Sequence, residues 1–506
     1  MTTLDAKRHA AVSCPPAGTD LLFLRLTGSD ELGRLSEYRV DLLSKSNDIQ
    51  AGDVLGHDMS VAIDLPAGGE RQMNGIVTAF RIVAPGDRTR NRMARYEAVV
   101  RPRLWMLTRA SHDRFFYQQT VPQIIAKVLQ DYQVDFSNKC SATYPSLEHC
   151  AQYRETDFAF VSRLMEREGI YYYFEHAGGK HTLVLTDSSD VHVAISGYAT
   201  IPYDAWYEPG AEKECVYNWS CGGELQTGNY EVNDYDFEKP SSSNQQGLVS
   251  RATRPTVYDP PVFTMQEHLS GHIQASDGDR YAKVGVEIRQ ARNDSIDGRA
   301  SARGIWPGGL FKLKGHARDA LNRDYLVVAA TYEVNSDAYM STYGDKKDLP
   351  FFDCAFTALR KENRFRSERT TPRALAAGPQ TAVVVGPDGQ EIFTDKYGRI
   401  MVQFHWEQFD PPADAGTRVK RCWVRVSQGW AGKRWGAFLL PRIGQEVLVE
   451  FIEGDPDRPL VTGSVYNANT MPPYELPANS ALSTLKSNST QGGGGYNEVR
   501  DRKSVV

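Results

Sequence analysis

Long apolar runs and a secretory signal are both missing from this 506-residue sequence. A membrane-spanning helix needs about 20 apolar residues, whereas the apolar run near the start, LLFLRL at 21–26, is short and contains Arg25. The first residues do not follow the basic, apolar and small order of a secretory signal. We therefore expect synthesis in the cytoplasm, and any export must use another route.

Signals for cysteine pairing and an excess of one charge are also lacking. The seven cysteines are odd in number and show no Cys-x-x-Cys spacing, which disfavours a disulfide scaffold or a zinc ribbon. We expect them to be small buried hydrophobic side chains in a reducing compartment. The 58 basic and 63 acidic residues give a net charge of −5, so no general attraction to nucleic acid or anionic membranes is expected.

Motifs for nucleophile, phosphate and metal chemistry are absent or incomplete. No Gly-x-Ser-x-Gly elbow occurs, so an α/β-hydrolase is not supported. Residues 429–433 are similar to part of a phosphate-binding loop, but Ser427 and Arg434 replace required residues, which favours a hairpin turn. His268 and His272 have the i, i+4 spacing of helical metal ligands, but a third ligand is not evident. These patterns predict no metal site and no cofactor site.

Two further clusters lie in residues 376–470. Glu453, Asp455 and Asp457 lie close together, and paired carboxylates can catalyse glycoside hydrolysis, but the glycine and proline between them favour solvated acids in a turn. The region holds 10 basic and 11 acidic residues, whereas a groove for a phosphate backbone needs excess positive charge. We therefore predict no catalytic residues and no nucleic-acid binding, although four rings are available for base stacking: Trp406, Trp423, Trp430 and Trp435.

Period-two alternation is the clearest pattern that the sequence does contain, and it is strongest in residues 383–467. At 400–406 the apolar side chains of alternate residues face one way, and the pattern recurs at 422–426 and 447–451. Turn-forming residues such as Pro-Asp-Gly at 387–389 separate the runs. About five short strands predict a small barrel here, for which the OB-fold is the commonest candidate.

Other segments predict further strands and a connecting linker. Residues 20–110 alternate apolar runs with turns, which predicts an antiparallel strand set that forms a barrel. Residues 310–334 predict a strand, a loop and a second strand, and residues 240–261 have a loop-like composition. Residues 360–379 are basic and rich in proline and alanine. The six Lys or Arg and two Glu of 360–373 are typical of a solvated connector, although contact with an acidic neighbour stays open.

Three helical segments are also expected. Residues 120–123, Thr-Val-Pro-Gln, have the form of a capping box, and an apolar stripe follows at helical spacing. A second helix is predicted from Thr156 to Glu168, with Gly169 ending it in a left-handed conformation. Charged and apolar residues also mix at helical spacing in residues 263–292. The chain is therefore predicted to be mainly β with a few helices, in several domains.

Three stretches carry a resemblance to a known family. They are QYRETDFAFVSRLMEREGIYYYFEH (152–176), GPQTAVVVGPDGQEIFTDKYGRIMVQFHWE (378–407) and WVRVSQGWAGKRWGAFLLPRIGQEVLVEFIEGDPDRPLVTGSVYNANTMPPYELP (423–477). Whole phrases resemble the VgrG family, the spike proteins of bacterial type VI secretion, which are similar to the hub and spike of contractile phage tails. The resemblance extends over almost all of residues 20–500.

The resemblance implies a division into three parts. Residues 1–375 would form a phage-hub-like base with two barrel-type β domains and helical insertions, and residues 376–470 an OB-fold barrel. Residues 471–506 would form the neck and the start of a trimeric β-prism or β-helix. After Arg500 the expected repeating strands are replaced by six residues, so we expect most of the needle to be missing.

The resemblance also implies a structural, non-enzymatic function. A homotrimer would sit on the hexameric tube protein Hcp, contact baseplate components, and receive a PAAR-type tip protein and effectors, although the tip site is expected to be missing here. Sheath contraction would drive the assembly from the bacterial cytoplasm through a target membrane, without a signal peptide. Two alternatives from other classes remain: a peptidoglycan-degrading hydrolase of the phage-spike type, and an oligonucleotide-binding OB protein.

Overall fold

A computed structural model describes most of the chain, which divides into two compact units. The described residues are 9–15, 21–208, 211, 213–240, 248–253, 263–268, 271, 274–291, 295–336, 350–407, 421–490 and 493–502. The first unit comprises residues 1–109, 125–145 and 161–371, and the second comprises 110–124, 146–160 and 372–506. Within the described ranges, no helix combines the length and the apolar character needed to cross a membrane.

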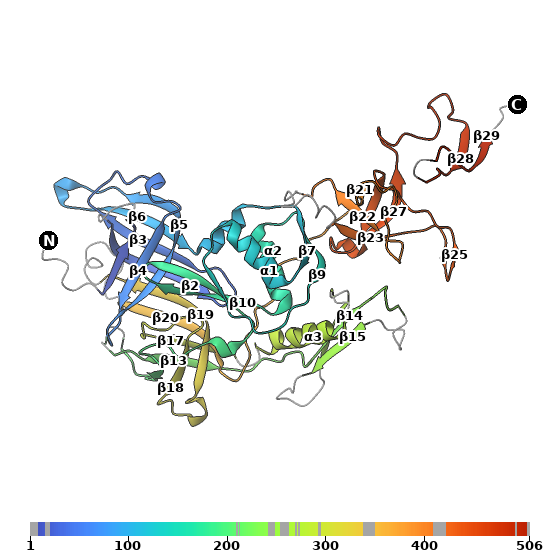
Figure 1. Cartoon of the computed structure of the whole chain (residues 1–506). Coiled ribbons are helices and arrows are strands. Elements are labelled where there is room, and N and C mark those ends of the chain that lie inside the picture. Colours follow the sequence, from blue (N-terminus) through green and yellow to red (C-terminus); the bar gives the residue numbers. More distant parts are fainter. Residues whose placement is uncertain are drawn as a thin grey trace. The chain divides into compact units, whose positions relative to one another are not determined.

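A 12-stranded sheet dominates the first unit (Figure 1). Its main path runs β1-β4-β5-β6-β3-β2-β19-β20-β17-β13, with β18 on β19 and β12 on β18. The strands are β1 (Ala10–Ser13), β2 (Leu22–Glu31), β3 (Glu37–Ser44), β4 (Asp58–Asp64), β5 (Glu70–Ala84), β6 (Ala94–Arg101), β12 (Thr200–Pro202), β13 (Val216–Cys221), β17 (Ile296–Ala300), β18 (Leu310–Lys314), β19 (Asp324–Asn335) and β20 (Phe352–Arg360).

The strands expected between residues 20 and 110 are confirmed, but they do not stand alone. In β4, Met59, Val61 and Ile63 are buried while the residues between them are partly exposed, as period-two alternation predicts. β2 pairs antiparallel with β19, so Asp30 lies opposite Ala330. The early strands and those of residues 216–360 therefore share one hydrogen-bonded sheet and one apolar core.

The first two predicted helices are confirmed as α1 (Val121–Asp131) and α2 (Asp157–Glu168), and α2 lies within one residue of its predicted bounds. The Thr120 backbone N–H donates to Gln123 Oε1 at 2.8 Å, which is one half of the predicted capping box. Gly169 follows α2 with a φ of 73°, a left-handed conformation that glycine adopts readily.

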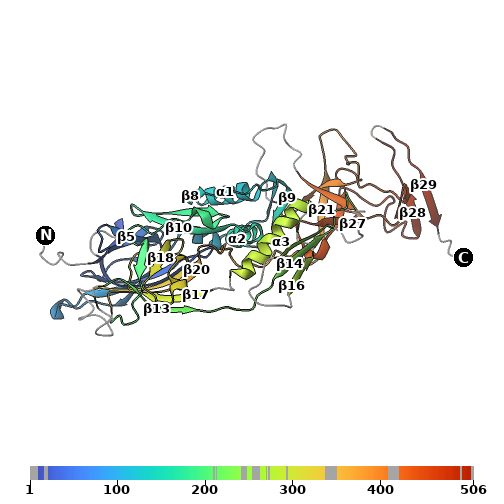
Figure 2. The same cartoon turned by 90° about the horizontal axis from the view of Figure 1, so that it is seen from below.

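A three-stranded sheet and a helix form a small subdomain of the first unit (Figure 2). The strand order is β15 (Leu248–Thr253), β14 (Asn229–Asp234) and β16 (Thr264–His268), and α3 (Ala275–Gln290) packs on β14 and β15. The helical prediction for 263–292 therefore holds for α3 but is wrong for β16, and the loop-like prediction for 240–261 is wrong for β15. Both short strands are stabilised by pairing with β14, which local composition does not reveal.

A second three-stranded sheet in the first unit has the order β10 (Tyr171–Ala177), β11 (Lys180–Thr186) and β8 (Phe136–Asn138). The run Tyr171–Phe174 is buried throughout. This strand follows directly after α2 and Gly169.

The second unit contains the predicted small barrel. Its five strands close in the order β21 (Gln380–Val385), β22 (Ile400–Phe404), β23 (Cys422–Val426), β27 (Pro459–Val465) and β26 (Glu446–Phe451). The predicted inward positions at 400–404, 422–424 and 447–451 line its core. The OB-type barrel is therefore confirmed in its strand number, closure and side-chain alternation.

A β-ribbon from the middle of the chain packs on this barrel within the second unit. Strand β7 (Arg114–Gln119) pairs with β9 (Leu147–Gln152). The Phe115 ring lies 5.7 Å from the Phe404 ring and 5.2 Å from the Trp406 ring, and the Tyr117 hydroxyl donates to a Glu407 carboxylate oxygen at 2.9 Å. Residues that precede the expected boundary at 375 thus complete the surroundings of the barrel core.

Two small hairpins complete the second unit (Figure 1). The first, β24 (Ala431–Gly432) with β25 (Trp435–Gly436), projects from the barrel. The second pairs β28 (Leu482–Lys486) with β29 (Glu498–Arg502) in the expected neck region.

Candidate functional site

The phosphate-loop-like segment is a hairpin, as predicted. Ala431 pairs with Gly436 and Gly432 with Trp435, which places Lys433 and Arg434 in a two-residue turn. Arg434 has a φ of 66°, which is typical of such tight turns. The segment therefore lacks the loop-to-helix geometry that binds phosphate.

The histidine pair does not form the predicted helical arrangement. His268 ends strand β16 and is exposed, so the i, i+4 geometry of two ligands on a helix does not apply. His272 lies outside the described residues. Within the described part of the chain, no group of three His, Cys, Asp or Glu side chains is arranged to hold a metal ion.

The acidic cluster has a structural role in two of its three members. Asp457 Oδ1 accepts a 2.5 Å hydrogen bond from the Ala151 backbone N–H, and the Asp457 carbonyl accepts a 2.8 Å bond from His149 Nε2, both on β9. Burial raises the pKa of Asp455, and the neighbouring charge of Asp457 adds to this. The interpretation as solvated acids is therefore wrong for Asp455 and Asp457. It holds for Glu453, which is exposed.

The four tryptophans divide into two groups. Trp406 packs between Phe115 and Tyr153, and its Nε1–H donates to Gln380 Oε1 at 2.7 Å. Trp423 lies 5.2 Å from the Phe393 ring and is half-buried. The exposed rings are those of the projecting hairpin, Trp430 and Trp435.

The basic segment at residues 360–373, here called the strap, departs most from its prediction as a solvated connector. Arg366 is largely buried, with 9% of its side chain exposed, and Ser367 is buried beside Gly33. The first twelve residues of the strap, 360–371, belong to the first compact unit, and the second unit resumes at Pro372. The alternative that it contacts an acidic neighbour is therefore the correct one.

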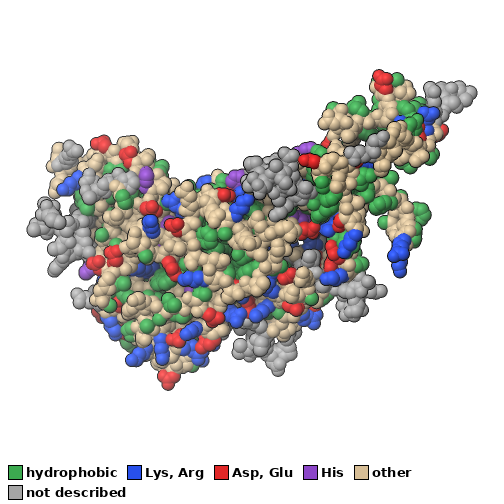
Figure 3. Space-filling model, viewed as in Figure 1, with side chains coloured by type: hydrophobic (Ala, Val, Ile, Leu, Met, Phe, Trp, Pro, Cys, Tyr) green, Lys and Arg blue, Asp and Glu red, His purple; other side chains and the backbone are tan. Residues whose placement is uncertain are grey.

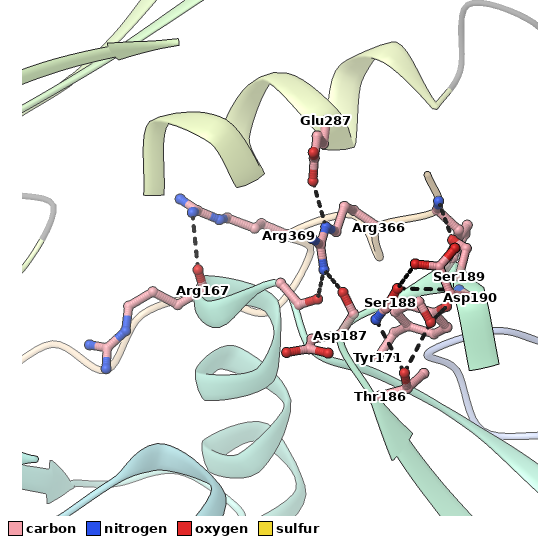
Figure 4. Close-up of polar contacts among 12 residues, drawn as sticks. Arg167, Tyr171, Thr186, Asp187, Ser188, Ser189, Asp190, Glu287, Arg366 and Arg369 are labelled. Carbon is pink, nitrogen blue, oxygen red and sulfur yellow. Dashed lines mark hydrogen bonds and ion pairs between the residues drawn. The ribbon is translucent and has the colours of Figure 1, made fainter. Parts of the chain in front are cut away.

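Arg366 joins three elements of the first unit (Figure 4). Its Nε donates to Glu287 Oε2 on α3 at 2.8 Å, and the Glu287 side chain has no exposed area. Its Nη1 donates to the carbonyls of Gly169, after α2, at 2.7 Å and of Asp187, after β11, at 2.5 Å. A guanidinium at the C-terminal end of a helix also interacts favourably with the helix dipole.

Arg369 and Thr371 fasten the end of the strap. Arg369 Nη1 donates to Glu267 on β16 at 2.9 Å. Its Nη2 donates to the Arg167 carbonyl at 3.4 Å, the contact that Figure 4 shows. The Thr371 backbone N–H and hydroxyl both donate to the Glu166 carboxylate, each at 3.0 Å. Glu166 is itself buried, so these donors replace the water that it lost on folding.

The start of the strap is fixed by Phe365. Its backbone N–H donates to Ser189 Oγ at 3.0 Å (Figure 4), and its ring meets the Tyr171 ring edge-on at 4.9 Å. A side chain at Gly33, whose φ is 75°, would bring its Cβ within 2.5 Å of Ser367 Oγ. The strap thus runs in a close-fitting path over the first unit.

The contacts of the strap indicate a structural role. Its cations pair with carboxylates and backbone carbonyls, an arrangement that resists displacement but offers no free nucleophile. Sequence composition showed the cations but not their partners. One signal in the sequence could have pointed to these partners: Glu166 and Glu287 lie at helix positions that are buried. A buried carboxylate requires a partner, such as a cation of the strap.

Known proteins resemble both parts of the chain. Residues 29–338 match the family model described as phage tail baseplate hub (GPD). Residues 380–466 match the one described as the type VI secretion system and phage-baseplate injector OB domain. In fold, the chain is similar to an E. coli type VI secretion component described as resembling the T4 bacteriophage tail proteins gp27 and gp5. That likeness has a TM-score of 0.62, at 21% identity, covering 90% of this chain and 99% of that one.

Sequence relatives span nearly the whole chain. The spike proteins VgrG1a and VgrG1b of Pseudomonas aeruginosa are each 42% identical to it; the matches cover 98% and 97% of this chain, and 76% and 65% of the relatives. A Vibrio cholerae protein named actin cross-linking toxin VgrG1 is 30% identical, over 91% of this chain and 41% of its own length. On the hub and OB-domain matches and on this identity, the chain belongs to the VgrG family of type VI secretion system spike proteins.

Proposed function

We propose that the chain is one subunit of a homotrimeric spike that works mechanically. Its base would sit on the hexameric Hcp tube and contact baseplate components, and its far end would lead to a PAAR-type tip protein and effectors. Sheath contraction would carry the assembly from the bacterial cytoplasm through a target membrane. Membership of the VgrG family supports this role.

The neck hairpin carries the argument for a trimer. Leu485 lies directly opposite Val499 in the β28–β29 pair, and the two residues are 65% and 77% exposed. An isolated two-stranded sheet is marginally stable in water, and an apolar face exposed to water lowers its stability further. The identical strands of two further chains would cover this face, as expected in a β-prism built from three chains.

A mechanical role is supported by the strap. A spike must transmit force from its base to its neck without local unfolding. The strap connects the first unit to the second along the chain, and buried charge-assisted hydrogen bonds fix it to helices and strands of the first unit. Such a connection stiffens the segment on which the load would act.

We further propose the three-part division at residues 1–375, 376–470 and 471–506, and no catalytic activity for this chain. The acids and tryptophan that the sequence singled out serve folding: Asp457 binds β9, and Trp406 packs in the barrel core. The net charge of −1 over residues 376–470 also disfavours an oligonucleotide groove.

Light scattering on the purified protein tests the trimer. The expected mass is three times the 56.6 kDa of the chain, and a monomer would contradict the proposal. Replacing Leu485 and Val499 together by Ser should weaken the trimer, while Trp206→Ser, at an exposed position of the first unit, should not. Co-sedimentation with assembled Hcp tubes tests the base contact. Clearing of a peptidoglycan suspension, or tight salt-sensitive binding of single-stranded DNA, would instead support one of the two alternatives.

A further inference from the structure

The projecting hairpin, defined as residues 428–440, is exposed along almost its whole length. Every residue from Gly429 to Leu439 is exposed. Four of them are large and apolar: Trp430 (63% exposed), Trp435 (60%), Phe438 (67%) and Leu439 (65%). Figure 3 shows hydrophobic side chains over this hairpin and basic ones at its tip, where Figure 1 labels β25. Large apolar side chains gathered on one exposed element mark an interaction surface.

The projecting hairpin is ordered by its own contacts. The Ala437 N–H donates to the Trp430 carbonyl at 2.9 Å, and the Gln428 side chain both accepts from and donates to the Leu439 backbone, at 3.0 and 3.1 Å. The two tryptophan rings meet edge-on at 5.2 Å. Because these side chains are already fixed, binding a partner would lose little conformational entropy.

Glycine at 432 is required for this arrangement. A Cβ added there would lie 2.4 Å from the Trp435 ring, so the ring rests directly on the glycine backbone. The hairpin therefore holds the Trp435 ring against Gly432 and Trp430 while leaving 60% of the residue exposed. Such an anchor is typical of residues that dominate an interface.

A second exposed apolar surface lies just after the barrel. The neck segment, defined as residues 465–476, exposes Val465 (40%), Tyr466 (64%), Met471 (71%) and Leu476 (56%). Its single charged residue is Glu475, whereas the charged residues of the projecting hairpin are Lys433 and Arg434. The two segments are therefore alike in apolar character, and their own charged residues are of opposite sign.

We propose that the projecting hairpin of one copy docks on the neck segment of the next copy around the threefold axis. This inference rests on the trimer proposed above. The named apolar side chains of both surfaces are exposed in one copy, and the two surfaces are different parts of the same unit. Two different surfaces of this kind allow a head-to-tail contact between copies, which can repeat around an axis and close into a ring. The basic tip would lie near Glu475 of the neighbouring copy.

Loss of the anchors tests the contact. The double variant Trp430→Ser/Phe438→Ser replaces two exposed side chains. Its melting temperature should therefore equal that of the wild type, when both proteins are compared at concentrations at which they are monomers. We expect the concentration of half-dissociation, followed by light scattering on dilution, to rise at least about tenfold. The matched control is Trp206→Ser, since Trp206 is 91% exposed in the first unit and should leave dissociation unchanged.

Engineered cysteines provide an independent measurement. In a Cys221→Ser background, which removes the exposed native thiol, Lys433→Cys combined with Glu475→Cys should cross-link to dimers and trimers on mild oxidation. Mixing the two single variants should yield heterodimers. If the wild type is trimeric but the serine variant dissociates normally and no cross-link forms, the hairpin contact is wrong and its apolar surface serves another partner. If the wild type is monomeric, the trimer itself is wrong.

Discussion

Arg366 Nε and Glu287 Oε2 lie 2.8 Å apart, with 9% of the arginine side chain and none of the glutamate side chain exposed. The arginine also satisfies two backbone carbonyls, so one guanidinium fixes the strap to α3, the end of α2 and the end of β11. Charge pairs of this kind contribute little when exposed but leave a large penalty when one buried partner is lost.

Replacing Arg366 should therefore destabilise the first unit strongly. Arg366→Met leaves the Glu287 carboxylate buried without its cation, and we expect a loss of about 3–5 kcal/mol in the free energy of unfolding. Arg364→Met, in the same strap but exposed, should change it by less than about 0.5 kcal/mol. Urea unfolding followed by fluorescence measures both. Equal effects of the two variants would contradict the importance of the Arg366 contacts.

Gly285→Ala should destabilise the subdomain around α3, against the usual helix preference. In a helix interior, alanine is ordinarily favoured over glycine by about 1 kcal/mol. Here the new Cβ would lie 2.5 Å from the Tyr230 ring, which belongs to the buried core beneath α3. We expect a net loss of about 1–3 kcal/mol, because the tyrosine has little room to move. Lys283→Ala, exposed on the same helix, is the control, and a stabilised Gly285→Ala protein would refute the packing.

Asp457→Ala should loosen the β7–β9 ribbon from the barrel. The substitution removes the carboxylate oxygen that accepts from the buried Ala151 N–H at 2.5 Å, and the loss of such a buried hydrogen bond costs about 1–3 kcal/mol. Hydrogen exchange should show faster exchange of the β9 amides, beginning at Ala151. Glu450→Ala, an exposed acid on β26, should leave those amides unchanged. Unaltered protection in Asp457→Ala would show that the ribbon is fixed by packing alone.

Acid should destabilise the first unit through its buried histidines. Burial lowers the pKa of His176 to about 3, and of His181 and His192 to about 4 each. Each is neutral in the fold but becomes protonated on unfolding below about pH 6.5. Their contribution is thus complete above that pH and falls by about 1.4 kcal/mol per histidine and pH unit as the pH drops toward the folded pKa.

A histidine variant separates this effect from other titrations. His181 Nδ1 donates to Asn74 Oδ1 at 2.6 Å and its Nε2 accepts from the Arg103 N–H at 2.9 Å, which fixes a neutral ring. His181→Gln should therefore lose less stability than the wild type between pH 7 and pH 5, as measured by urea unfolding at each pH. His57→Gln, at an exposed position, should retain the wild-type dependence.

Local patterns predicted the barrel and the first two helices well. The barrel strands showed period-two alternation, and residues such as Val402, Val424 and Val449 are buried where the alternation placed them. A capping box and a C-terminal glycine bounded α1 and α2 because such signals act within a few residues. The alternation at 400–406 puts Trp406 on the same side as the buried Phe404, and its ring packs against the barrel core.

Contacts between residues far apart in the sequence could not be predicted from such local patterns. Alternation shows which side of β2 faces the core but not that β2 pairs with β19, some three hundred residues later. The strap looked solvated because composition counts charges without locating the buried carboxylates that bind them. Asp457 was missed as a structural residue for the same reason, since its partners on β9 are distant in sequence.

The pairing of β2 with β19 has a consequence for biosynthesis. Arg25 and Glu333, which meet across this pair, are 308 positions apart. At roughly 5–20 residues per second, β2 must wait on the order of 15–60 s at the ribosome before its partner strand is made. During that interval the β2 edge that later pairs with β19 is open to wrong partners, so the nascent chain should depend on a chaperone until β19 emerges.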